Sequence, residues 1–63
     1  MKEIKVTFTG RFVGSIGITS HSIVYVVVPK HLTADNAKSQ DFEGIYAQLY
    51  KSHEHISNVK INF

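Results

Sequence analysis

The densest run of side chains with ligand or acid–base chemistry is His53-Glu54-His55. In an extended segment the two imidazoles lie on one face, which is a possible start for a zinc site. Such a site needs three or four ligands, and the other candidates (Asp41, Glu43 and His31) have no obvious spacing to this pair. A solvated turn after a helix explains the same residues, because the helix dipole favours histidine near a helix C-terminus. We therefore expect no metal site and no cofactor.

Three glycines punctuate the segment 10–22, at Gly10, Gly14 and Gly17. A phosphate-binding loop would show G-x-G-x-x-G or end in Gly-Lys-Ser/Thr, with a helix directly after it. Neither pattern is present, so these glycines indicate a hairpin loop rather than a nucleotide site. No nucleophile–base pair or carboxylate pair stands out in the chain, and a core this small leaves little room for a pocket. We expect a protein that is not an enzyme.

The formal charge is +2, from seven Lys and Arg residues against five acidic residues. The basic residues are spread along the chain, whereas a dedicated DNA-binding domain concentrates them on one face. Nucleic-acid binding through backbone contacts therefore stays an alternative function. Its candidate residues are Lys5, Arg11, Lys30, Lys38 and Lys60.

The strands follow from hydrophobic periodicity. Residues 3–9 alternate, with Ile4, Val6 and Phe8 on one face, which predicts a half-buried strand. The segment 10–22 is either a long connection or an extension of the flanking strands through a bulge at a glycine. We favour the extension, because Ile16 and Ile18 keep a period of two. Residues 58–63 alternate again and predict the last strand.

Residues 23–28 form an uninterrupted apolar strand that ends at Pro29, which cannot donate to a ladder. Such a strand needs cover on both faces, and a chain of 63 residues can hardly supply two covering layers. The strand at 23–28 therefore predicts a partner. Alternatively, residues 10–20 fold back and cover its edge.

A helix is predicted after residue 39, with Ser39 as a candidate N-cap and acidic residues in its first turn. Its apolar stripe is expected to place Tyr46 in the core and Tyr50 at the border of the stripe. The residues of the stripe are Phe42, Ile45, Tyr46, Leu49 and His53.

These elements predict a single α+β domain over residues 1–63, of β-β-α-β order. An antiparallel-rich sheet of three to four strands carries one helix packed on one face. The simplest topology places strand 3–9 between strands 23–28 and 58–63, antiparallel to both. There is no Cys, no signal peptide and no apolar run long enough to span a bilayer, so we expect a cytoplasmic protein without membrane contact.

The apolar edge strand indicates a non-enzymatic protein-interaction module. Either Ile23, Tyr25 and Val27 or the intervening valines point away from the helix. We predict an interface formed by Ile23, Tyr25, Val27 and Phe12, with homodimerisation through strand 23–28 and docking onto a different protein as the two versions. A compact regulator or inhibitor of the kind that phages and mobile elements encode would fit this size.

Overall fold

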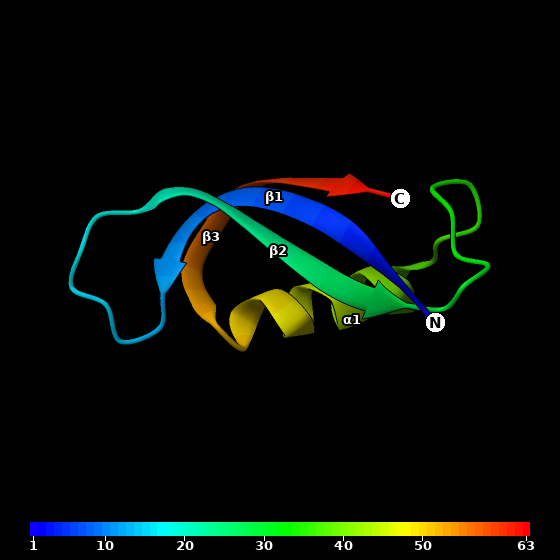
Figure 1. The fold of residues 1–63 in the computed structure, drawn as a ribbon, viewed down its shortest axis with the longest axis horizontal. Coiled ribbons are helices and arrows are strands. Elements are labelled where there is room, and N and C mark those ends of the chain that lie inside the picture. The colour runs from blue at the N-terminus through cyan, green and yellow to red at the C-terminus, as the bar shows by residue number, and fades with distance from the viewer.

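The structure is a computed structural model that describes residues 1–63. It contains three strands and one helix: β1 (Lys2–Phe12), β2 (Ser20–Val28), α1 (Ser39–Tyr50) and β3 (His53–Asn62). The sheet order is β2-β1-β3, and β1 is antiparallel to both neighbours (Figure 1). The predicted α+β class and the central position of the first strand are confirmed. The sheet has three strands, and no fourth strand forms.

The first strand is longer than its alternating segment, because it continues through Gly10 to Phe12. The sheet is tightly packed at Gly10, since a Cβ built there would lie 3.2 Å from the backbone oxygen of Glu54 and 3.2 Å from the Phe8 ring. The extension of β1 is therefore correct. The placement of Ile16 and Ile18 in a strand is wrong, since both lie in the connection between β1 and β2.

The second strand pairs with β1 from Lys2↔Val28 to Gly10↔Ser20. Its even-numbered valines face the core, and Val26 and Val28 are buried. Ile23, Tyr25 and Val27 face away from the helix and are exposed. The structure thus decides between the two orientations that the sequence left open.

The helix begins one residue earlier than a Ser39 N-cap implies. Lys38 is the N-cap, and the Asp41 carboxylate accepts a hydrogen bond from its backbone N–H at 2.9 Å. Ile45 and Leu49 are buried against the sheet, whereas Tyr46 is 37% exposed, so its assignment to the core is wrong. The prediction assumes that every residue of the stripe is buried. Only two helix residues, Ile45 and Leu49, are buried against the three-stranded sheet.

The third strand begins at His53, five residues before the predicted start at 58. His53 therefore belongs to the sheet and does not continue the helical stripe. His55 (φ 55°) and Asn58 (φ 52°) adopt left-handed backbone conformations, and the register to β1 shifts between Thr7 and Arg11. These irregularities interrupt the alternation, which is why only the tail of β3 is recognisable as a strand from the sequence.

The core lies between the sheet and α1. It contains eight buried hydrophobic residues, including Leu32, which the loop between β2 and α1 contributes. The chain end closes this layer, since the Phe63 ring packs edge-on against Phe42 at a centroid distance of 6.2 Å. The opposite face of the sheet carries no covering layer (Figure 1). No helix is long and apolar enough to cross a membrane.

Candidate interaction surface

The exposed large hydrophobic residues outnumber the buried ones: ten are exposed, and the core contains eight. Seven of the ten lie between residues 12 and 27 and fall into two groups. The first, which we call the hairpin tip, consists of Phe12, Val13, Ile16 and Ile18. The second, the β2 outer row, consists of Ile23, Tyr25 and Val27.

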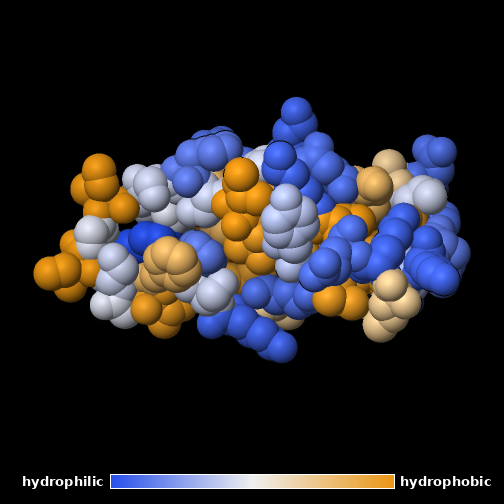
Figure 2. All heavy atoms as spheres, viewed as in Figure 1, coloured by the Kyte–Doolittle hydropathy of each residue, from blue (hydrophilic) through white to orange (hydrophobic).

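The hairpin tip projects from one end of the elongated molecule, beyond the sheet (Figure 1). Apolar atoms gather at this end in the space-filling view (Figure 2). Ile16 and Ile18 are fully exposed, so the loop does not fold back to cover β2. The alternative in which residues 10–20 shield the edge of the sheet is therefore wrong.

A polar network holds the hairpin tip in place. Arg11 donates from Nε and Nη2 to Glu54 Oε2, at 3.1 and 2.9 Å, and from Nη1 to the carbonyl of Gly17 at 3.1 Å. The backbone N–H of Gly17 donates to Ser15 Oγ, and that of Val13 to the Ser52 carbonyl. The loop therefore presents its apolar side chains from a bonded backbone.

The hydrogen bonds from Arg11 lower the pKa of Glu54 below its usual value of 4.5. Partial burial opposes this shift, while the backbone N–H of Gly14 and the nearby charges of Arg11 and His55 support it. Glu54 therefore stays ionised over the whole neutral range, and the pair with Arg11 persists there. Arg11 is one of the residues proposed for nucleic-acid contacts. Its guanidinium group already makes three hydrogen bonds within the chain.

Phe12 connects the hairpin tip to the core through His53. The Phe12 ring lies over the His53 ring, with 4.5 Å between the ring centroids and 33° between the planes. His53 also forms a T-shaped pair with Phe8, with 4.9 Å between the ring centroids, and its Nδ1 is 2.7 Å from Ser52 Oγ. His53 is thus a buried, hydrogen-bonded packing residue. His55 is exposed, and no group of three or more potential ligands forms around either histidine.

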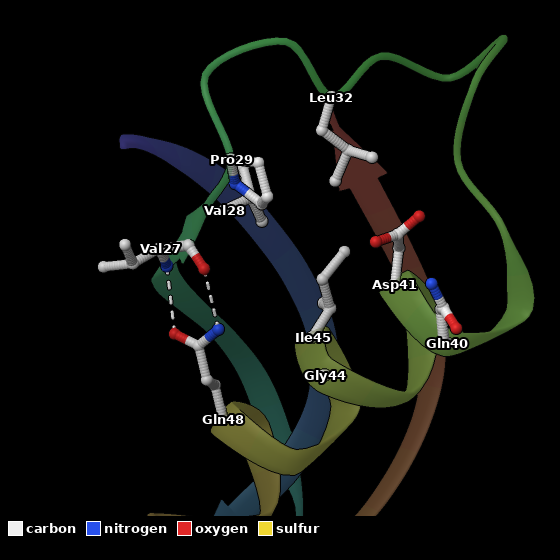
Figure 3. Close-up of a pocket in the computed structure, with 9 residues that line it drawn as sticks. All are labelled: Val27, Val28, Pro29, Leu32, Gln40, Asp41, Gly44, Ile45 and Gln48. Atoms are coloured by element: carbon white, nitrogen blue, oxygen red, sulfur yellow. Dashed lines mark hydrogen bonds between the residues drawn. The ribbon is translucent and has the colours of Figure 1, made fainter.

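The β2 outer row lies beside polar side chains of β1. Tyr25 is opposite Lys5, Ile23 is opposite Thr7, and Tyr25 is 62% exposed. At Val27 the edge of the strand is covered from the helix: Gln48 Oε1 accepts from the Val27 N–H and Gln48 Nε2 donates to the Val27 carbonyl, both at 2.9 Å (Figure 3). We call this pair of bonds the Gln48 clamp.

The five basic residues proposed for nucleic-acid contacts do not form one surface. Lys5 and Lys60 share the outer face of the sheet, where Thr7 of β1 pairs with Lys60. Arg11 lies at the end of the sheet near the hairpin tip, whereas Lys30 and Lys38 flank the loop at the opposite end (Figure 1). The structure therefore separates the groups that would have to act together.

A small open pocket lies between the end of β2, the loop after it and the first turns of α1 (Figure 3). Its volume is about 130 Å³, below the roughly 300 Å³ at which small-molecule sites begin. Asp41, its only ionisable side chain, already caps the helix. The one ionisable group of the pocket is therefore part of the helix cap.

The sequence predicts Phe12, Ile23, Tyr25 and Val27 as interface residues but does not single out Val13, Ile16 or Ile18. The period of two at Ile16 and Ile18 favours a strand, although the glycines at 14 and 17 are a signal for a loop. Gln48 was also missed. Nothing in its sequence context distinguishes an amide that clamps a strand edge from one that faces solvent.

No family model, curated protein or solved structure matches the chain. The arrangement of its own side chains is therefore the basis for a function. The hairpin tip and the β2 outer row are the two features that the fold leaves apolar and uncovered.

Proposed function

We propose that this chain is a non-enzymatic protein-interaction module that acts by occupying the surface of another polypeptide chain and that assembles as a homodimer through β2. One observation supports the proposal above all others: the chain exposes more large hydrophobic residues than it buries, and most of them lie in one segment. That segment, residues 12–29, contains no Asp, Glu, Lys or Arg. Exposed apolar surface that is concentrated in this way marks interaction sites.

The hairpin tip suits contact with a different protein. Its fully exposed isoleucines can enter an apolar pocket, and the Arg11 network already fixes the loop that carries them. Fixing a loop before binding reduces the conformational entropy that binding must overcome. A regulator or inhibitor that works by occupying a partner's surface needs this combination of apolar anchors and a preordered backbone.

The β2 outer row suits self-assembly. A long apolar strand at the edge of a sheet is a site for pairing with another chain. Tyr25 is large, rigid and amphipathic, which are the properties of residues that anchor interfaces. Strand pairing would extend the sheet and bring the outer rows of two copies together.

The test is the mass of the assembly in solution, measured by sedimentation velocity over a dilution series. The wild-type chain is expected to sediment as a dimer at high concentration. Tyr25→Asp should sediment as a monomer with an unchanged circular dichroism spectrum, because the new carboxylate lies opposite Lys5 and is compatible with the fold but not with an apolar interface.

Ser57→Asp is the control, because Ser57 is also exposed but lies on β3, at the other edge of the sheet, opposite Thr9. It adds the same charge away from β2 and should leave the dimer intact. Val27→Lys should act like Tyr25→Asp. A wild-type chain that stays monomeric at all concentrations, or a Tyr25→Asp chain that still dimerises, would contradict assembly through β2.

A further inference from the structure

The backbone of β2 has free hydrogen-bonding groups on its outer edge at three residues. In an antiparallel pair, alternate residues direct both their N–H and C=O groups to the same side. Val27 directs both to Gln48, away from β1. Tyr25, Ile23 and His21 therefore direct theirs to the same open edge. The carbonyl of Lys5, opposite Tyr25, supports this assignment, because it accepts from Asn62 on the β3 side.

The two edges of the sheet are not equivalent. The β3 edge contains left-handed residues at His55 and Asn58 and two register shifts, so it presents no regular row of groups. The β2 edge is regular from Ser20 to Val28. Irregular edges resist pairing, whereas a regular one is a template for another strand. The β2 edge is therefore the edge at which the sheet can grow.

The chemistry of this edge favours a second copy of the same chain. Residues 12–29 carry no Asp, Glu, Lys or Arg side chain. Two such edges can approach without like-charge repulsion, and neither attracts a strongly charged partner. Antiparallel pairing of a strand with its own copy also satisfies two-fold symmetry, since the same groups meet from both sides.

The Gln48 clamp limits how far a second strand can pair. Registers that centre on Val24 or Tyr25 would need the backbone groups of Val27, which Gln48 already holds. Registers that centre before Ile23 would run into the connection beyond Ser20. Only a register centred on Ile23 uses every free group of both copies and no group that is occupied or outside the strand.

We propose that two copies pair β2 with β2 in antiparallel orientation about a two-fold axis at Ile23, and that the Gln48 clamp selects this register. The inference rests on the proposed homodimer. Ile23 lies opposite the partner's Ile23, and His21 lies opposite the partner's Tyr25. About six backbone hydrogen bonds form across the interface. The residue opposite Val27 is the partner's Thr19, which is outside the strand. Pairing therefore ends where the Gln48 clamp of one copy meets the end of β2 in the other.

Cysteine cross-linking tests the register, because the chain contains no cysteine of its own. In Ile23→Cys the two Cα atoms lie about 5.5 Å apart across the axis, inside the roughly 4.4–6.8 Å range that a disulfide spans. Oxidation should convert most of this variant to a covalent dimer. Tyr25→Cys alone should not cross-link, because the two positions are offset by about 13 Å along the strands. A mixture of His21→Cys and Tyr25→Cys chains should form the mixed disulfide.

The role of Gln48 is tested by removing the clamp from the Tyr25→Cys variant. Gln48→Ala frees Val27 and admits the register centred on Tyr25, so the disulfide yield should rise several-fold. Gln40→Ala is the control, since Gln40 also lies on α1 and holds no backbone group of β2. No increase on removal of Gln48, or an equal increase on removal of Gln40, would overturn its role as the selecting residue.

Different results would contradict the homodimer and the register centred on Ile23. A wild-type chain without self-association removes the homodimer and the register with it. A wild-type dimer in which Ile23→Cys stays reduced, or in which Tyr25→Cys cross-links with Gln48 intact, retains the homodimer but overturns the register.

Discussion

The isoleucines of the hairpin tip should contribute to binding but not to the stability of the fold. The double variant Ile16→Ser, Ile18→Ser tests this expectation. Both side chains are at least 91% exposed, so almost no apolar contact is lost in the folded monomer. The free energy of unfolding should change by no more than about 0.5 kcal/mol, as for other surface substitutions. The matched control is Ile45→Ala, because the same residue type at 1% exposure should cost about 2–5 kcal/mol.

The same double variant should have a large effect on binding. A fully buried isoleucine contributes about 1.5–3 kcal/mol. For a partner protein that covers both side chains, the double variant should therefore lose about 3–6 kcal/mol of binding free energy, or roughly 10² to 10⁴ in affinity. The isolated chain offers a direct measure of the same surface, since removal of the two isoleucines should shorten its retention in hydrophobic interaction chromatography.

Urea denaturation followed by far-ultraviolet circular dichroism, at a concentration where the chain is monomeric, gives the stability comparison. A loss of more than about 1 kcal/mol in the double variant would refute the reasoning, because it would mean that the tip packs against the core. Unchanged chromatographic retention would refute it equally, since the tip would then not be the accessible apolar surface.

Three further outcomes follow from other sites in the fold. Gly10→Ala should reduce the free energy of unfolding by about 1–3 kcal/mol, since its Cβ would lie 3.2 Å from the Glu54 carbonyl oxygen; an unchanged urea midpoint would contradict this. Because folding lowers the pKa of Glu54, its stabilising effect should be present above about pH 4.5 and disappear as the pH falls through the lower folded value, so Glu54→Gln should lose less stability than wild type between neutral pH and about pH 3. Leu49→Ala, at a fully buried position of α1, should cost about 2–5 kcal/mol and unfold much of the population of so small a domain; thermal melts that match wild type would count against this core.

The elements that the sequence predicts well are those in which one residue pattern serves one structural role. The alternation of β1 and the apolar run of β2 each specify a strand, because a period of two places the same face against the helix throughout. The sequence also gives the position of β1 between its neighbours, since the helix must connect the two outer strands across the face it covers. These features are local or follow from short connections.

Other features depend on contacts between distant residues, and the sequence cannot supply them. His53 continues the helical stripe in sequence, yet its position against Phe8 and Phe12 requires the helix to end at Tyr50, three residues before it. The loop around Ile16 keeps a strand-like period, but Arg11, which is bonded to the distant Glu54, also donates to the Gly17 carbonyl within this loop. In both cases tertiary contacts overrule the local pattern.

The Gln48 clamp restricts strand pairing at one end of β2, while the rest of that edge stays open. A helix side chain satisfies the backbone of Val27, so pairing is blocked at one end of β2 while the groups of His21, Ile23 and Tyr25 stay available. An unprotected apolar edge pairs in many registers and promotes aggregation. An edge that is closed at Val27 and ends at Ser20 admits one symmetric partner strand of matching length. The same edge then limits growth to two copies, because each pairing consumes the only regular edge that each copy has.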